Sequence, residues 1–168
     1  HPKFINCDAG KLFAAATKCP VALVNDADAA GIAEMKFGAG RGQRGMVLLI
    51  TLGTGVGTAL FYRGMLFPNT ELGHLPIRGR SAERYISTAA RKRRRLSWAV
   101  WGAELGAYLR TLEMLLWPDL IIIGGGASAK SGKFFRYIKC RAPVVAAASL
   151  NGAGIVRAAL CAAPEVRE

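Results

Sequence analysis

The sequence has few cysteines, and none of them stands in a pattern that binds metal or builds a disulfide framework. The four cysteines, at positions 7, 19, 140 and 161, include no C-x-x-C pair, which argues against a zinc ribbon and a disulfide-stapled domain. No apolar run reaches the ~18 residues of a membrane-spanning helix. The first residues, His1-Pro2-Lys3, lead into no apolar core of a signal peptide. These absences predict a cytoplasmic chain without a membrane segment.

Acidic side chains are also scarce. The 168 residues contain 11 Asp and Glu against 23 Lys and Arg, a net charge of +12. This imbalance favours an anionic partner: a nucleotide, a polyphosphate, a nucleic acid or an acidic lipid. Hydrophobic residues make up 52% and glycines number 20, which is typical of an α/β domain. Because the first residue is not methionine, we expect the chain to begin partway through a longer protein.

The most informative stretch is a glycine-rich loop between two apolar runs, within residues 47–61. The runs predict two buried strands, and the glycines predict a tight connection between them. Successive backbone N–H groups in such a turn can bind an anion. The loop carries Gly53, Gly55 and Gly57, with the hydroxyls of Thr51, Thr54 and Thr58 beside it. A Rossmann fingerprint would open a helix instead, so we interpret the stretch as a phosphate cradle, with an ordinary glycine-rich hairpin as the alternative.

A second candidate lies where a short apolar run gives way to helix formers. Residues 21–24 predict a buried strand and residues 27–37 a helix. Asn25 and Asp26 would then lie at the edge where α/β sheets bind ligands. Two interpretations of Asp26 stay open: a helix N-cap and a general base that deprotonates a substrate hydroxyl.

The remaining elements frame this centre. Helices are predicted over residues 9–17, capped by Asp8, and over 98–117 and 152–161, and strands over 120–123 and 144–147. Gly124–Gly126 follow a strand and open a helix, which makes a second candidate for holding a phosphate. The segment 124–131 nearly fits a Walker loop, but Ala129 stands where the motif requires a glycine, so we reject it.

Two polar clusters complete the candidates. Glu71 and His74 are three residues apart, so their side chains can converge on the hydroxyls of a sugar, although a solvated loop pair fits equally. A run of cations follows, and five of them are consecutive: Arg91, Lys92, Arg93, Arg94 and Arg95. These five cannot share one helical face, because each residue advances by about 100°. Both a solvated charge run and a track for a polyanion stay open.

Taken together, four ordered segments resemble the ROK family of sugar kinases in the hexokinase–actin superfamily, and within it the bacterial polyphosphate/ATP glucokinases. The segments are 25–31 (NDADAAG), 51–57 (TLGTGVG), 68–74 (PNTELGH) and 117–120 (WPDL) with the glycine run after it. The resemblance implies a ribonuclease H-like α/β lobe, a mixed sheet flanked by helices, over residues 25–168. Residues 1–24 would be the remnant of, or the connection to, a first lobe. That lobe carries a D-x-G-G-T loop in the family, and this chain has no counterpart.

The resemblance also implies roles for single residues. Asp26 would be the base that activates the 6-hydroxyl of glucose, and Asn25, Glu71 and His74 would hold the other hydroxyls. Mg²⁺ is expected at the phosphates of the donor, polyphosphate or ATP. The phosphate and nucleotide contacts would come from Thr51, Gly53, Thr54, Gly55, Gly124, Gly125 and Gly126.

Two features of the sequence favour the polyphosphate glucokinases over other members of the family. Typical ROK kinases have a cysteine-rich zinc site after the G-H pair, and no such cluster stands here, so neither zinc nor another protein-bound metal is expected. The cations at 91–95 would contact a long polyphosphate. The expected function is glucose phosphorylation from polyphosphate or ATP, although a chain with one lobe should turn over slowly, if at all.

The alternatives within the family are an ATP-only hexose kinase and a sugar-sensing repressor, which would carry a helix-turn-helix. No nucleic-acid partner is expected, because only the cation run supports one. A homodimer stays open.

Overall fold

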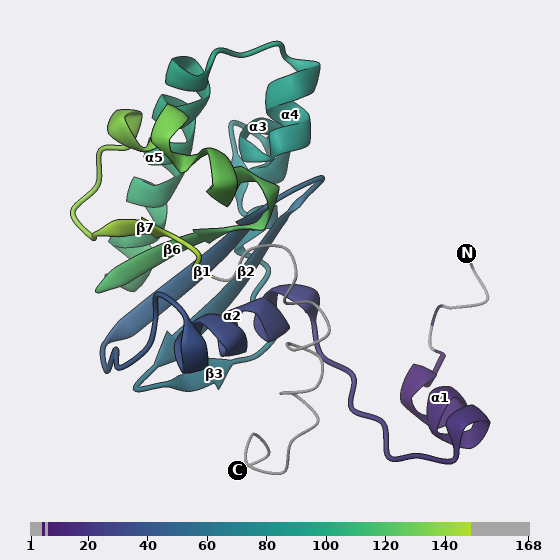
Figure 1. Ribbon diagram of the computed structural model, residues 1–168. Coiled ribbons are helices and arrows are strands. Elements are labelled where there is room, and N and C mark those ends of the chain that lie inside the picture. Colours follow the sequence, from purple (N-terminus) through teal and green to yellow (C-terminus); the bar gives the residue numbers. More distant parts are fainter. Residues whose placement is uncertain (1–4, 6, 149–168) are drawn as a thin grey trace.

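A computed structural model describes residue 5 and residues 7–148 of the chain (Figure 1). Its centre is a five-stranded sheet in the order β3-β2-β1-β6-β7. β1 pairs antiparallel with β2 and parallel with β6, so the sheet is mixed, as predicted. β3 is antiparallel to β2, and β7 is parallel to β6. The strands are β1 (Met46–Leu52), β2 (Val56–Tyr62), β3 (Met65–Phe67), β6 (Leu120–Gly124) and β7 (Val144–Ala146).

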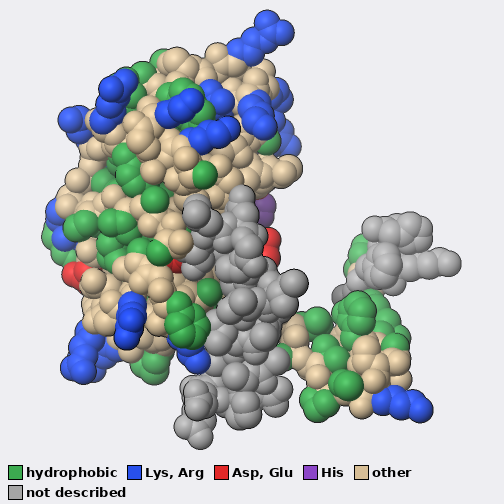
Figure 2. Space-filling model, in the orientation of Figure 1, with side chains coloured by type: hydrophobic (Ala, Val, Ile, Leu, Met, Phe, Trp, Pro, Cys, Tyr) green, Lys and Arg blue, Asp and Glu red, His purple; other side chains and the backbone are tan. Residues whose placement is uncertain are grey.

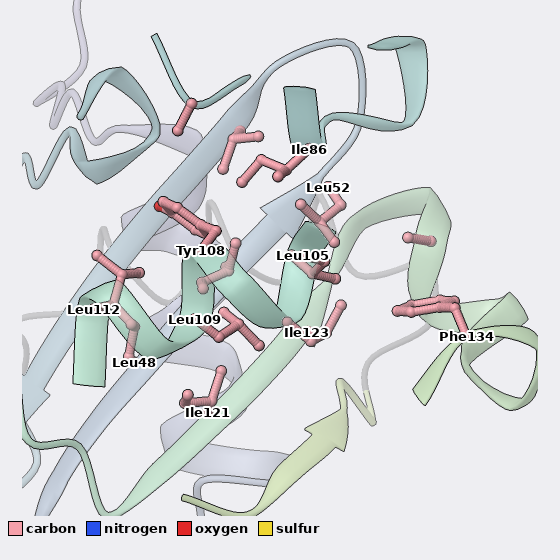
Figure 3. Packing of buried hydrophobic residues seen from close by; sticks show 14 of the residues in the cluster. Leu48, Leu52, Ile86, Leu105, Tyr108, Leu109, Leu112, Ile121, Ile123 and Phe134 are labelled. Carbon is pink, nitrogen blue, oxygen red and sulfur yellow. The ribbon is translucent and has the colours of Figure 1, made fainter. Parts of the chain in front are cut away.

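Helices cover both faces of this sheet, with α2 (Asp26–Phe37) on one side and α5 (Trp98–Leu116) on the other (Figure 1). Successive residues of β1 therefore enter different clusters, and both faces are apolar, which explains the unbroken apolar run in the sequence. The cluster under α5 (Figure 3) includes Leu48, Ile50, Leu52, Ile121, Ile123, Leu105 and Leu109. The cluster under α2 includes Val47, Leu49, Ala59, Phe61, Ile122, Ala30 and Ile32.

The predicted helices are confirmed where the structure describes them. The Asp8 side chain accepts a hydrogen bond from the Lys11 amide and caps α1 (Ala9–Thr17). α5 ends at Leu116, and Trp117 follows in the left-handed conformation. The helix expected after the glycine run is a 3₁₀ helix, η3, with a kink at Lys130. The helix predicted over 152–161 lies outside the described residues.

Short elements fill the connections between the sheet and α5. They are η2 (Leu72–His74), β4 (Pro76–Ile77), β5 (Arg80–Ser81), α3 (Glu83–Ile86), α4 (Thr88–Arg93), η3 (Gly125–Lys133) and η4 (Phe135–Tyr137). Within the described part of the chain, no helix combines the length and the apolar composition needed to cross a lipid bilayer.

The predicted strand at residues 21–24 is wrong. This segment runs without regular structure, and Leu23 is 61% exposed. An apolar run becomes a strand only where a neighbour pairs with its backbone, and none of the described strands does so. The adjacent helix α1 likewise buries none of its residues and stands apart from the sheet in Figure 1. The apolar side chains of this N-terminal stretch therefore face away from the core described above.

Arg94 fastens the end of α4 to α5. Its Nη1 and Nη2 donate to the two carboxylate oxygens of Glu104 at 2.6 and 2.8 Å, and Nη1 also donates to the Tyr85 carbonyl at 3.3 Å. A bidentate pair of this kind is among the stronger polar contacts in proteins. It holds α3 and α4 in place beside the carboxyl end of β1.

Candidate active site

An open cleft of about 540 Å³ lies where the N-terminus of α2 meets the loop between β1 and β2. This volume falls in the range of small-molecule sites, about 300–1,000 Å³. The cleft brings together segments that are far apart in the sequence. Its lining residues are Asn25, Asp26, Ala30, Thr51, Gly53, Thr54, Gly55, Val56, Gly57, Glu71, Glu83 and Gly125.

The N-cap of α2 is Asn25 and not Asp26, and both residues line the cleft. Asn25 is the N-cap, because its Oδ1 accepts from the amides of Ala27 at 2.8 Å and Asp28 at 3.4 Å. Asp26 is the first residue of α2 and is exposed. It makes no hydrogen bond or ion pair with any described residue. Its carboxylate therefore faces the cleft with no partner in the described part of the chain, at a helix end that favours negative charge.

The close approach of α2 to the hairpin depends on Gly57. A Cβ at this position would lie 2.9 Å from the Ala27 Cβ and 2.7 Å from the Thr51 Oγ1. Real side chains do not pack at these distances, so a larger residue would push the helix away. The absent side chain at position 57 is what lets Asp26 stand over the glycine loop.

The glycine loop is held from behind by the start of α4. The Gly53 carbonyl accepts from the Thr88 hydroxyl at 2.6 Å and from the Ala89 amide at 3.2 Å. The amides of Thr54 and Gly55 find no acceptor among the described residues, so they are available to an anion. The hairpin thus has the features of a phosphate cradle, with two threonines, Thr51 and Thr54, at its edge.

Thr58 does not belong to this cradle, contrary to the expectation from sequence. It is buried, and its hydroxyl lies 2.8 Å from the Thr70 carbonyl, to which it donates. The Thr70 hydroxyl donates in turn to the Thr58 carbonyl at 2.9 Å, and the Leu72 amide reaches the Thr58 Oγ1 at 3.2 Å. These bonds attach the loop that contains Glu71 to strand β2.

Glu71 and His74 come together as expected. The His74 Nε2 lies 3.6 Å from the Glu71 Oε2, and its Nδ1 lies 4.0 Å from the Glu83 Oε1. The Ser81 hydroxyl is 3.4 Å from the same Nδ1. Glu71 and Glu83 line the cleft, whereas His74 stands between the two carboxylates outside that lining.

Sequence reasoning missed Glu83. Its Oε2 lies 2.9 Å from where a Cβ would stand at Gly55, so the carboxylate lines the cleft directly beside the loop. The signal in the sequence was its isolation, because Glu83 is the only acidic residue between positions 78 and 95.

Two candidate sets remain, the glycines 124–126 and the cations 91–95, and neither set lies in the cleft as a whole. Gly125 lines the cleft, while Gly124, which pairs with Thr51 in the parallel ladder, and Gly126 do not. Among the five consecutive cations, Arg91 stacks on Trp98 with 3.8 Å from its Cζ to the ring centroid, and Arg94 is paired with Glu104. Lys92 and Arg95 are exposed and do not line the cleft. The run is therefore not one continuous binding surface.

Comparison with known proteins places the chain in a family. The model of the ROK family matches residues 1–91. The chain belongs to the ROK family. It is 44% identical over 140 residues to the polyphosphate glucokinase of Mycobacterium tuberculosis, an alignment that spans 83% of this chain and 53% of that protein. The chain thus spans about half the length of the curated relatives it matches.

Solved structures of the ROK family share the fold. The inorganic polyphosphate/ATP-glucomannokinase of Arthrobacter sp. strain KM superposes with a TM-score of 0.87 and 46% identity, over 92% of this chain and 61% of that one. A ROK glucokinase from Streptomyces griseus, solved with glucose and AMPPNP, gives a TM-score of 0.74 at 24% identity, over 89% of this chain and 70% of that one. The predicted fold class, a lobe of the hexokinase/actin type, is confirmed.

Asp28 follows Asp26 on α2 and carries a buried carboxylate, since the residue is only 2% exposed. Its Oδ2 accepts from the Asn69 amide at 2.8 Å, while its Oδ1 has no partner among the described residues. Burial raises the pKa of Asp28, and the charges of Glu71 and Asp26 raise it further, against the lowering effect of the Asn69 bond. The pair ties the loop of Glu71 to α2.

This pKa shift predicts a pH-dependent effect of the Asp28→Asn substitution. The variant keeps an oxygen for the Asn69 amide but cannot ionise. A raised pKa in the folded protein means that wild-type Asp28 loses its stabilising contribution as pH rises through that pKa. Relative to wild type, the free energy of unfolding of the variant should therefore increase as the pH rises from about 4, the ordinary pKa of an aspartate, through the raised pKa of the folded protein. Urea unfolding across this range measures it, and a difference that does not vary with pH would contradict the assignment.

Proposed function

We propose that this chain forms one lobe of a sugar kinase that phosphorylates the 6-hydroxyl of glucose. The supporting observation is the shared cleft, in which the unpartnered Asp26 carboxylate and the free amides of the glycine loop line the same space. A carboxylate and an anion cradle in one cleft are the two groups that a phosphoryl transfer to an alcohol requires. Relatives at 44–46% identity carry the names polyphosphate glucokinase and polyphosphate/ATP-glucomannokinase.

In the proposed reaction, Asp26 accepts the proton of the 6-hydroxyl while that oxygen attacks the terminal phosphorus of the donor. The bond from this phosphorus to its bridging oxygen breaks, and the shortened donor leaves with the electron pair. The amides of Thr54 and Gly55 stabilise the charge on the transferred group. Mg²⁺ bound by the phosphate oxygens of the donor is the expected cofactor. Gly125, on the neighbouring strand end, is a contact for the donor.

Sugar recognition is assigned to the polar groups around Asp26. The Glu71 and Glu83 carboxylates accept hydrogen bonds from sugar hydroxyls. Asn25 uses its Oδ1 in the helix cap, so its amide nitrogen is the group that donates to the ligand. His74 lies 3.6 Å from the Glu71 carboxylate and 4.0 Å from the Glu83 carboxylate, so we assign it to the same group of sugar ligands.

We further propose that residues 1–24 pack against a second lobe, and that residues 25–168 form the lobe described here. The exposed apolar side chains of α1 and of the segment that follows it, Leu12, Phe13, Leu23 and Val24, are the expected contacts. Hexokinase-type sites close between two lobes, which excludes water from the reaction. The cleft described above is open on one side and needs such a closing partner.

The general-base role predicts the outcome of Asp26→Asn. In the two-lobed enzyme, kcat should fall by about 10²–10⁴-fold, the usual contribution of a general base. The glucose Kd should change by no more than about threefold, because the amide keeps the shape of the side chain and an acceptor oxygen. A coupled assay of glucose 6-phosphate and calorimetric titration measure the two quantities. Asp119→Asn is the matched control, because Asp119 is exposed at the end of β1 away from the cleft and the amide keeps an oxygen for the Met46 N–H. A variant at position 26 that keeps wild-type kcat would refute the role.

The two-lobe proposal predicts that the 168-residue chain alone is nearly inactive. Its open cleft cannot exclude water or complete the phosphate contacts. The same coupled assay on the isolated chain should give a rate close to background, against clear turnover when a first lobe is present. Efficient glucose 6-phosphate formation by the chain alone would contradict the requirement for a second lobe.

A further inference from the structure

A second open cleft, of about 620 Å³, adjoins the first and shares Thr54 and Glu83 with it. Four arginines line it: Arg80, Arg84, Arg93 and Arg94. They come from β5, α3 and the end of α4, and these three short elements lie beside the glycine loop. Lys and Arg side chains also gather over the upper part of the molecule in Figure 2. A groove rich in positive charge thus leads away from the phosphate cradle.

The charges of these arginines are not equivalent. Arg94 is neutralised by its bidentate pair with Glu104. Arg80, Arg84 and Arg93 are exposed and form no ion pair within the described part of the chain. The Arg93 Nη2 donates to the Arg84 carbonyl at 3.1 Å, which anchors one guanidinium over α3. These three cations share the concave surface with one carboxylate, that of Glu83, so positive charge is in excess there and favours a bound anion.

The chemistry of the cleft favours a chain of phosphates over a compact anion. The glycine loop occupies the junction, so the terminal phosphoryl group of a donor would lie there and the next groups would pass Thr54. A short donor ends near the loop, whereas a long linear donor reaches the three arginines. Guanidinium groups bind phosphate oxygens with two parallel N–H donors. A concave groove that is continuous with the site also suits a thin, flexible chain better than a double helix.

We propose that Arg80, Arg84 and Arg93 bind the part of a linear polyphosphate that lies beyond the transferred phosphoryl group. This inference rests on the proposed function, since it takes the glycine loop as the cradle of that group. It replaces the consecutive cations 91–95 with a set assembled from three elements. Arg93 is common to both, whereas Arg91 and Arg94 have structural partners, Trp98 and Glu104.

The test compares two variants of equal charge loss in the 168-residue chain. The cleft variant carries Arg80→Ser, Arg84→Ser and Arg93→Ser. The control variant carries Arg41→Ser, Arg44→Ser and Arg63→Ser, all exposed and near the opposite ends of β1 and β2. Calorimetric titration with long-chain polyphosphate and with tripolyphosphate, at an ionic strength of about 0.15 M, avoids the exaggerated surface electrostatics of low salt.

The cleft variant should bind long-chain polyphosphate at least about tenfold more weakly, since it loses three charge-assisted contacts. Its affinity for tripolyphosphate should change by no more than about twofold, and the control variant should keep both affinities within about twofold. Equal losses in the two variants would mean diffuse attraction and would overturn the proposal. So would equal losses for the two ligands, or equally tight binding of a short duplex DNA to the same arginines.

A single substitution separates a loss of binding from a loss of folding. Arg84→Ser alone, whose side chain makes no hydrogen bond within the described residues, should lower the affinity for long-chain polyphosphate severalfold in a chain that keeps its wild-type circular dichroism. No loss in that folded variant would overturn the proposal. If the two-lobed enzyme does not phosphorylate glucose but the arginines still bind polyphosphate, the proposed function alone is refuted. If it phosphorylates glucose but the arginines do not bind polyphosphate, the proposed role of the arginines alone is refuted.

Discussion

The site depends on one close approach, that of the N-terminus of α2 to the hairpin of β1 and β2. Gly57 permits it, because any side chain there would meet Ala27 at 2.9 Å. The apolar layers on both faces of β1 fix the hairpin, and the first residue of α2 then stands over its glycine loop. The parallel pairing of β1 with β6 brings a second glycine segment to the same edge. The Asp26 carboxylate and the glycine loop thus line the same cleft at this edge of the sheet.

The outer walls of the site are placed by a few polar contacts between elements. Thr58 of β2 and Thr70 of the following loop exchange hydrogen bonds, and the Asn69 amide donates to Asp28. Arg94 forms a bidentate pair with Glu104. Buried polar groups of this kind are costly when unpaired, so each contact favours one arrangement of its loop over the others. They set the positions of Glu71 and of the arginine-lined groove, which apolar packing alone would leave loosely defined.

The sequence predicts the parts of this structure that short-range physics determines. The hairpin, α5 and the Asp8 cap follow from apolar runs, helical periodicity and local capping. Residues 21–24 show the limit, since an apolar run does not say whether a partner strand is present. Thr58 and Glu83 show another: one turns inward and the other toward the cleft because of residues 12 to 28 positions away. The pairing of Arg94 with Glu104 lies ten residues off, so the run of cations could not be divided from sequence.

The most direct measurement is a crystal structure of the two-lobed protein with glucose bound. The expected result is a glucose molecule between Asp26 and residues 53–55, with its 6-hydroxyl oxygen about 2.6–3.2 Å from a carboxylate oxygen of Asp26. Glu71 and Glu83 should contact the remaining hydroxyls. Glucose bound elsewhere, or bound in the cleft with its 6-hydroxyl turned away from Asp26, would contradict the proposed chemistry.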